Sequence, residues 1–515
     1  MKTKNLINLF ILMLVLFVPF YACEEDKNEK EIIEVETDEK AAADDKVNQE
    51  TDSVPKYVFV FIGDGMSSPQ INITEAALND PVFKLKSVGI GELNLRKLPV
   101  TGMQTTYAED RYITGSAASG TALATGQKTT IGTISMNGDH SEDIKTIAEM
   151  SRDKGMKVGV ISSVSIDHAT PACFYAHNES RNNYQEIGQD LINSEFDYFA
   201  GGNVRFNKYT DYTLDDFKSD AEAKGYSYVS SRSDFNALDN NSGKVIATLK
   251  SLQTFTGDGS AMPYAIDLDE QSGEDDKITL AEFTQKGIDI LDNENGFFMM
   301  VEGGKIDWAC HANDVVSAAM DLMAFDDAIG AAIDFYNKHP DETLIIVTGD
   351  HECGGLTLGF AATGYETSFN LLNYQSRSFW SFTNDVRGWA EAGDKIFEEA
   401  LVEVKAVFGL GDAEKGLALS DYETGLLEDA FNRSMSGESA HSGEELAVIY
   451  GYYDPFTVTV THILNNKAGI DWTTYSHTGT PVPVFAMGAG QDQFGGYYDN
   501  TDIGKKIIEI AQLNQ

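Results

Sequence analysis

An apolar run ending in a Gly-Asp-Gly turn opens the part of the chain expected to fold, YVFVFIGDG at residues 57–65. Three later runs share this design: VGVI at 158–161, FFMMV at 297–301 and LIIVT at 344–348. Continuous apolar runs of this length are typical of strands buried on both faces. Amphipathic segments at 143–154 and 312–336 lie between them. The alternation predicts an α/β fold, with a doubly wound, mostly parallel central sheet flanked by helices.

Carboxylates and imidazoles follow the ends of these four runs. They are Asp64, Asp167, His168, Glu302, Asp350 and His351. Open α/β sheets place their ligands at the carboxyl ends of the strands. The preference of turns for Asp and Gly explains one such end but not four. The pattern therefore predicts a shared metal site.

Two further groups strengthen this prediction. Asp307 and His311 are four residues apart, so on a helix they share one face and can hold one cation. His477 lies in the segment YSHTG at 475–479. Aspartate and histidine together favour zinc-like ions over calcium or magnesium alone.

A calcium-binding EF-hand loop is excluded near residue 270. With Glu282 as its twelfth position, Asp276 falls where the loop needs glycine. Thr279 and Glu282 instead predict a capping box that opens a helix before the 297–301 strand.

The candidate nucleophile is Ser116, which follows Gly115 and begins the segment SAASGTALATG at 116–126. Small residues let an anion approach closely, and a helix starting near Ser116 would point its amides at that anion. Such segments also serve close helix packing. No GxSxG elbow surrounds Ser116, so metal coordination is the expected means of activation.

The composition restricts the partners. The 515 residues include 38 Lys and Arg against 81 Asp and Glu, a formal charge of −43. We therefore expect no nucleic acid as a binding partner. Hydrophobic residues make up 42% of the chain, enough for a sizeable core. An anionic substrate would need a local positive centre, which bound metal supplies.

The N-terminus indicates export. A basic head, an apolar run at 6–20 and a small residue at position 22 predict a signal peptide over residues 1–22. A helix that spans a membrane needs about 20 apolar residues, and this run is shorter. The tail FYAC at 20–23 resembles a lipobox, which makes Cys23 the expected lipidation site. The alternative is cleavage as an ordinary secreted protein. We expect a periplasmic or cell-surface protein, lipid-anchored to a membrane.

An acidic segment follows. Residues 24–52 contain 13 acidic and 4 basic side chains. Such a stretch buries too little surface to offset its ordering entropy. The prediction is a disordered tether over 23–55, followed by one catalytic domain over 56–515.

Three other cysteines, Cys173, Cys310 and Cys353, allow at most one disulfide among them. None has a CxxC partner, which favours buried apolar roles over metal ligation.

Taken together, these segments closely resemble the alkaline phosphatase family. The matching segments lie at 61–66, 116–119, 169–181, 301–311, 350–351 and 477–479. They occur in the family's order and cover most of the chain from about Tyr57 onward.

The resemblance implies a metal-dependent phosphate monoester hydrolase that acts through a phosphoserine intermediate and releases inorganic phosphate outside the cytoplasm. Ser116 would be the nucleophile, and Arg181 would pair with the phosphoryl oxygens; the alternative for Arg181 is a surface ion pair. Two zinc ions and one magnesium ion would be bound. Their ligands would be Asp307, His311 and His477 for the first zinc, Asp64, Asp350 and His351 for the second, and Asp64, Thr170 and Glu302 for the third ion.

Three positions depart from the best-known bacterial members. Gly115 stands where an Asp often helps to position the arginine, which implies a looser Arg181. His168 and Trp308 replace an Asp and a Lys near the third metal and the phosphate. The identity of the third ion is therefore left open.

The 125 residues between His351 and His477 are too many for a loop. The resemblance implies a crown-like insertion at about 360–470, with helices expected at 395–408 and 421–432. Its aromatic residues Phe379, Trp380, Phe382 and Trp389 would pack in a core or line a substrate entrance. Most relatives are homodimers, so a homodimer is expected.

Two alternatives stay open at this level. A related phosphodiesterase would share the metal ligands, and comparing monoester with diester turnover separates it. A non-catalytic metal- or phosphate-binding lipoprotein would bind phosphate without hydrolysis.

Overall fold

The computed structural model describes residues 53–79, 92–205, 212–249, 260–268, 277–437 and 443–514. The chain divides into two units, Met1–Glu50 and Thr51–Gln515, and all described residues belong to the second. The predicted signal peptide, Cys23 and most of the predicted tether lie outside the described residues. Of the tether, residues 53–55 are described, and the Ser53 hydroxyl donates a hydrogen bond to the Asp341 carbonyl at 2.6 Å.

One large sheet forms the centre of the second unit. Its strand order is β12 (Gly496–Asp499), β2 (Val100–Thr105), β11 (Val482–Gly488), β8 (Thr343–Gly349), β1 (Tyr57–Gly63), β7 (Phe297–Glu302), β3 (Lys157–Ser162), β4 (Tyr198–Gly201), β6 (Lys244–Thr248) and β5 (Tyr226–Val229). The described strand pairs are parallel, except that β11 runs antiparallel to both of its neighbours. The four predicted strands are confirmed as β1, β3, β7 and β8.

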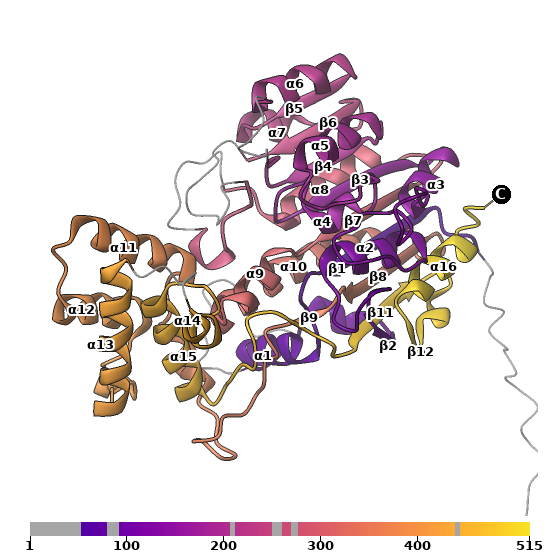
Figure 1. Ribbon diagram of the computed structural model, residues 1–515. Helices are drawn as coiled ribbons and strands as arrows, with labels where there is room; N and C mark the ends of the chain where they lie inside the picture. Colours follow the sequence, from indigo (N-terminus) through magenta and orange to yellow (C-terminus); the bar gives the residue numbers. More distant parts are fainter. Residues whose placement is uncertain are drawn as a thin grey trace, which may run out of the picture. The chain divides into compact units, whose positions relative to one another are not determined.

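Helices cover both faces of this sheet (Figure 1). Along β1, Phe59 and Phe61 belong to one hydrophobic cluster, together with α8 (Leu280–Leu291) and α10 (Val315–Tyr336). The alternate residues Val58 and Val60 belong to a second cluster, together with α2 (Ser116–Thr125), α3 (Ile147–Asp153), α5 (Tyr184–Asn193) and α16 (Thr501–Ile510). Since successive strand residues point to opposite faces, a strand buried on both must be apolar throughout. The doubly wound architecture is confirmed.

The predicted helix starts are set by caps. α3 begins after Thr146 and α8 after Thr279, and both have the reciprocal bonds of a capping box. The helix expected at 312–336 begins at Val315, because the Asp314 side chain accepts from the Ser317 amide.

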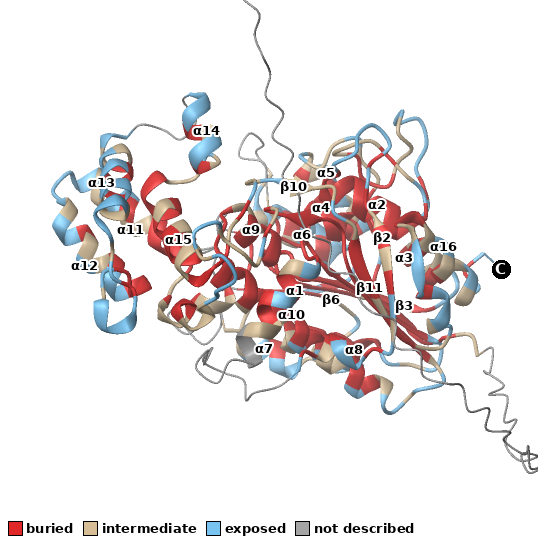
Figure 2. Cartoon of the chain, turned by 90° about the horizontal axis from the view of Figure 1, so that it is seen from below, coloured by how far each residue is buried: buried red, intermediate tan, exposed pale blue. Residues whose placement is uncertain are grey.

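The segment between β9 (Glu352–Cys353) and β10 (His477–Thr478) is helical. It contains α11 (Phe379–Ala392), α12 (Phe397–Phe408), α13 (Asp421–Ser436), α14 (Glu444–Tyr450) and α15 (Pro455–Ala468). These helices gather apart from those that cover the sheet (Figure 1). Both helices expected here from sequence are confirmed. The outer faces of α12 and α13 are exposed, whereas the central strands of the sheet are buried (Figure 2).

Within the described residues, no helix combines the length and the apolar character that crossing a membrane requires.

Candidate active site

The carboxyl ends of three adjacent strands bring the first carboxylates together. Ile62 of β1 pairs with Glu302 of β7, and Gly63 pairs with Gly349 of β8. In this register Asp64 and Asp350 lie at one level, and Glu302 lies two positions earlier at the same edge of the sheet. All three side chains are buried.

A first group combines Asp307 and His311 of α9 (Lys305–His311) with His477 of β10. His311 Nε2 lies 3.2 Å from Asp307 Oδ2 and 3.1 Å from His477 Nε2. The Nδ1 atoms of the two histidines lie 2.6 Å from the Tyr475 carbonyl and 2.9 Å from the Thr114 carbonyl. These contacts fix both rings with Nε2 turned toward Asp307. The face-sharing prediction for Asp307 and His311 is confirmed.

His477 reaches this group because β9 and β10 pair as a short antiparallel ribbon, with His477 opposite Cys353. The buried carboxylate of Glu352 supports the ribbon. It accepts hydrogen bonds from the Thr478 hydroxyl and from Gln70 Nε2 at 2.8 Å. The ribbon therefore carries a histidine from late in the chain to the end of β8.

A second group lies next to the first. His351 Nε2 is 3.1 Å from Asp350 Oδ2 and 3.4 Å from Asp64 Oδ1. Asp350 is held by the amides of Gly65 and His351, which donate to its Oδ1 at 3.1 and 2.9 Å. Its other oxygen is thereby directed toward His351.

A third group shares Asp64. The Thr170 hydroxyl, in the short helix α4 (Ala169–Ala172), donates to Asp64 Oδ2 at 3.3 Å. Glu302 accepts a short hydrogen bond from the Ser162 hydroxyl. One ligand atom each from Asp64, Glu302 and His168 also lie within 4.8 Å of one another. His168 is thus placed where it can reach the third group.

Ser116 lies at the first position of α2, and Gly115 caps that helix in an extended conformation. The Ser116 hydroxyl is 3.4 Å from His351 Nε2. The predicted helix start is confirmed, and α2 directs its N-terminal amides toward the same space. A Cβ at Gly115 would meet only Ile131, at 3.5 Å. A side chain would therefore fit at this position.

Arg181 reaches the same space from the segment that follows α4. Its backbone amide donates to the Gly132 carbonyl at 2.8 Å, and its guanidinium lies 3.2 Å from His168 Nε2. Burial, and then the charge of Arg181, holds the pKa of His168 well below its usual value. A neutral His168 accepts the hydrogen bond from Arg181. His168 therefore helps to position Arg181, the role that an Asp often has where this chain has Gly115. Trp308 stands edge-on to His168, with ring centroids 5.8 Å apart.

Without a bound cation, the charged form of three of these carboxylates is disfavoured. Burial raises the pKa of Glu302 to about 8 and that of Asp350 to about 6. Burial, together with Asp350 and Asp307, raises the pKa of Asp64 well above its usual value. Burial acts the same way on Asp307, but His311 and His477 outweigh it and hold its pKa well below the usual value. A bound cation would reverse these upward shifts.

The unpaired oxygens fit such cations. In the part of the chain that the structure describes, one oxygen each of Asp64, Glu302, Asp307 and Asp350 is buried without a hydrogen-bond partner. Buried carboxylates are normally paired or bound to metal. The donor sets Asp307–His311–His477 and Asp64–His351, together with the oxygen-rich third group, match the ligand preferences of zinc-like and harder ions.

The cysteines Cys173, Cys310 and Cys353 are buried and unpaired, so no disulfide joins them. Burial raises the pKa of all three thiols. Cys353 nevertheless lies in the same ligand cluster as Asp307, His311 and His477. Its sulfur contacts the Asp307 carbonyl at 3.7 Å. Without a CxxC spacing, no sequence signal pointed to this position.

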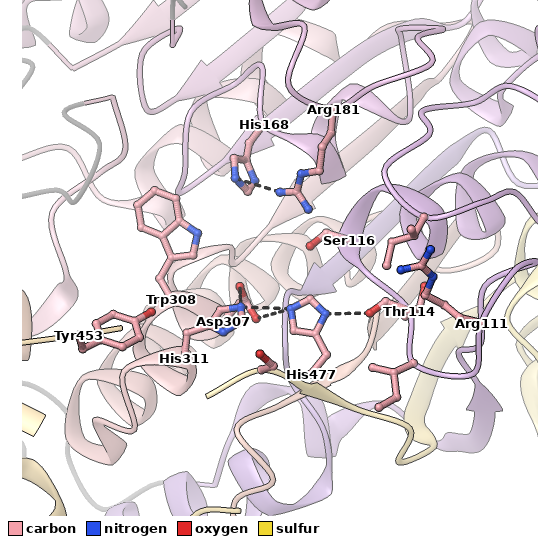
Figure 3. Close-up of a pocket in the computed structure, with 13 residues that line it drawn as sticks. Arg111, Thr114, Ser116, His168, Arg181, Asp307, Trp308, His311, Tyr453 and His477 are labelled. Atoms are coloured by element: carbon pink, nitrogen blue, oxygen red, sulfur yellow. Dashed lines mark hydrogen bonds and ion pairs between the residues drawn. The ribbon is translucent and has the colours of Figure 1, made fainter. Parts of the chain in front are cut away.

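A cavity of about 590 Å³ opens above these groups (Figure 3). Ser116, Arg181, His168, Trp308 and the first metal group line it. The lining residues that were not predicted from sequence are Arg111, Ile113, Thr114, Ile131, Tyr453 and Ser476. The four aromatic residues considered at the entrance do not line this cavity and pack with the main core, so the core interpretation is confirmed.

Comparison with known proteins agrees with this geometry. Residues 55–513 match the family model described as alkaline phosphatase. Alkaline phosphatase 3 of Bacillus subtilis is 33% identical over 486 residues, covering 92% of each chain. The crystal structure of a cold-active alkaline phosphatase from Shewanella is 30% identical with a TM-score of 0.70, covering 88% of this chain and 99% of that one. A variant of the alkaline phosphatase of the Antarctic bacterium TAB5, with Mg bound in its M3 site, is 27% identical with a TM-score of 0.60, covering 90% and 99%.

The family model and these relatives extend over the sheet, the clustered carboxylates and histidines, and the cavity. The chain therefore belongs to the alkaline phosphatase family, whose members depend on metal ions, and it is a phosphoric monoester hydrolase.

Proposed function

We propose that the chain hydrolyses phosphate monoesters through a phosphoserine intermediate on Ser116. The observation that carries this proposal is the position of the Ser116 hydroxyl, 3.4 Å from His351 Nε2 at the N-terminus of α2 and at the floor of the cavity. Ser116 Oγ attacks phosphorus in line with the ester oxygen, the alcohol leaves, and water then cleaves the phosphoserine to inorganic phosphate.

Arg181 pairs with two of the phosphoryl oxygens, since a guanidinium fork matches two acceptors at once. The contact with His168 orients that fork. The N-terminal amides of α2 face the same anion.

The proposed metal ligands are the three groups described above. Asp307, His311 and His477 would hold one zinc ion, Asp64, Asp350 and His351 a second, and Asp64, Thr170 and Glu302 a magnesium ion. A TAB5 variant in which one histidine is replaced by glutamate has Mg bound in its M3 site, which supports magnesium as one of the ions. When bound, these ions supply positive charge to the attacking and leaving oxygens of the displacement.

The test is Ser116→Ala, with Ser119→Ala on the same helix as the control. We expect Ser116→Ala to lower turnover of an aryl phosphate by about three orders of magnitude or more, with metal content retained. Mass spectrometry of acid-quenched enzyme should show one added phosphoryl group in the parent and in Ser119→Ala, and none in Ser116→Ala. A phosphoryl adduct in Ser116→Ala would exclude this nucleophile.

We also propose export, with a signal peptide over 1–22, a lipid anchor at Cys23, a tether over 23–55 and an insertion over about 360–470. The basic, apolar and small-residue pattern before Cys23 supports the first two. Cys23→Ser should move the protein from the detergent phase to the aqueous phase on partitioning. Family resemblance supports a homodimer, which sedimentation at several concentrations will test.

A further inference from the structure

Tyr453 reaches the cavity from the segment between β9 and β10. It follows α14 after a turn in which Gly451 and Tyr452 have φ of 59° and 68°. This left-handed pair reverses the chain and returns Tyr453 to the cavity wall. The hydroxyl of Tyr453 points into the cavity on the side of Trp308 and His311 (Figure 3).

The Tyr453 ring is fixed by its neighbours. It stands edge-on to Phe379, with centroids 5.8 Å apart, and is tilted against Tyr475 at 6.3 Å. The neighbouring Trp308 ring is also held, because the Lys305 ammonium lies 4.6 Å from its centroid. The hydroxyl therefore sits at the end of a ring that is held on two sides.

The helix that supports Tyr453 is anchored to the active site. The amide of Phe379, the first residue of α11, donates to the buried carboxylate of Asp314 at 2.9 Å. Gln375 Nε2 donates to the same carboxylate at 2.9 Å. Asp314 is three residues beyond His311. Its hydrogen bonds to Phe379 and Gln375 therefore connect the helix bearing His311 to the segment that packs against Tyr453.

Tyr453 stands on the leaving-group side of the cavity. Ser116 lies against His351, and an in-line displacement expels the alcohol on the side opposite the attacking hydroxyl. Asp307 and His311, whose proposed zinc ion would receive the leaving oxygen, line the cavity together with Trp308 and Tyr453. Figure 3 shows these residues on one side of Ser116. Burial and, to a smaller degree, the charges of Cys353 and Asp307 raise the pKa of Tyr453, so its hydroxyl stays protonated and can donate.

The walls favour a neutral alcohol. Arg111, which also lines the cavity, is already paired with Asp110 at 2.6 Å. This pairing offsets part of the Arg111 charge and so reduces its attraction for a second anionic group. On the side of Trp308 and Tyr453 the cavity offers their two aromatic rings and the Tyr453 hydroxyl, and Ser476 also lines the cavity. Such a surface packs against the C–H groups of a polyol and hydrogen-bonds one of its oxygens.

Resting on the proposed function, we propose that Tyr453 is a specificity-determining residue whose hydroxyl hydrogen-bonds the leaving alcohol of polyol and sugar phosphates, with Trp308 as the apolar wall. The leaving group of an aryl phosphate has no hydroxyl within reach of Tyr453, so this hydrogen bond does not accelerate its hydrolysis.

The experiment compares Tyr453→Phe with the parent enzyme on glycerol 2-phosphate, glucose 6-phosphate and p-nitrophenyl phosphate. The readout is the ratio of kcat/KM for each polyol or sugar ester to that for the aryl ester, because kcat/KM includes departure of the alcohol. We expect both ratios to fall about five- to tenfold, as for loss of one hydrogen bond. Thermal unfolding verifies that the variant remains folded.

Tyr452→Phe is the matched control, since Tyr452 is the neighbouring exposed tyrosine and does not line the cavity. Its ratios should equal those of the parent enzyme. Unchanged ratios in Tyr453→Phe, or an equal fall in Tyr452→Phe, would overturn the inference. Failure of the parent enzyme to hydrolyse any of the three esters would instead overturn the proposed function.

Discussion

Arg181 is positioned both through its backbone and through its side chain. The backbone of Arg181 is tied to Gly132, and its side chain to His168. A phosphate in the cavity would meet a preorganised donor fork rather than a mobile side chain. The Gly115 departure does not leave the arginine without a neighbour, because His168 supplies one from a different loop.

We expect Arg181→Ala to raise both KM for phosphate esters and Ki for inorganic phosphate about 10- to 100-fold. The reason is the loss of charge-assisted hydrogen bonds worth about 1.5–3 kcal/mol. Arg181→Lys should recover only part of this, since lysine keeps the charge but not the fork. Inhibition by phosphate provides the measurement, and an unchanged Ki in Arg181→Ala would contradict the assignment.

At the scale of elements, the segment carrying Arg181 is tied to α3 by an ion pair. His177 Nε2 lies 3.1 Å from Glu149, the third residue of α3, and His177 Nδ1 lies 2.8 Å from the Ser135 carbonyl. Burial opposes protonation, but the hydrogen bond and the charge of Glu149 outweigh it and raise the pKa of His177 to about 9.

This pair makes stability depend on pH. Because the folded pKa of His177 lies above the unfolded value, its stabilisation is complete below about pH 6.5 and is lost as the pH rises through about 9. Glu149→Gln removes the charge but keeps an acceptor for the capping box. We expect this variant to be about 1–3 kcal/mol less stable at pH 6, with the difference vanishing near pH 10. Urea unfolding at pH 6, 8 and 10 measures it, and a difference independent of pH would refute the linkage.

At the scale of the whole molecule, a chain of net charge −43 places several of its carboxylates together in its interior. Asp64, Glu302, Asp307 and Asp350 are all nearly inaccessible, and within the described structure each has an oxygen without a hydrogen-bond partner. We therefore predict that the domain depends on bound cations for stability as well as for activity.

Removal of metal with a chelator should lower the midpoint of thermal unfolding and abolish hydrolysis together. Ions that bind only the folded state stabilise it by mass action, so adding zinc and magnesium should restore both properties. Calorimetry and elemental analysis of the same samples provide the measurement. A chelated protein that lost its ions but kept its unfolding midpoint would show that the carboxylates need no cation.

Much of the sheet could be predicted from sequence because burial on both faces demands uninterrupted apolar runs. The runs now seen in β1, β3, β7 and β8 had that character. Short strands such as β9 and β10, of two residues each, carry no periodic signal. Helix starts were off by a few residues where a Thr or Asp cap lay inside the amphipathic segment, as at Thr146 and Asp314.

The sequence by itself determined the strand ends, the i to i+4 pair of Asp307 and His311, and the chemical types gathered for the site, because these depend on local periodicity and spacing. Only the tertiary structure decided which distant residues meet. The β9–β10 pairing brings His477 to His351, a loop contact places His168 beside Arg181, and a chain reversal returns Tyr453 to the cavity. Contacts between residues many tens of positions apart depend on how the whole chain packs, and no local pattern encodes them.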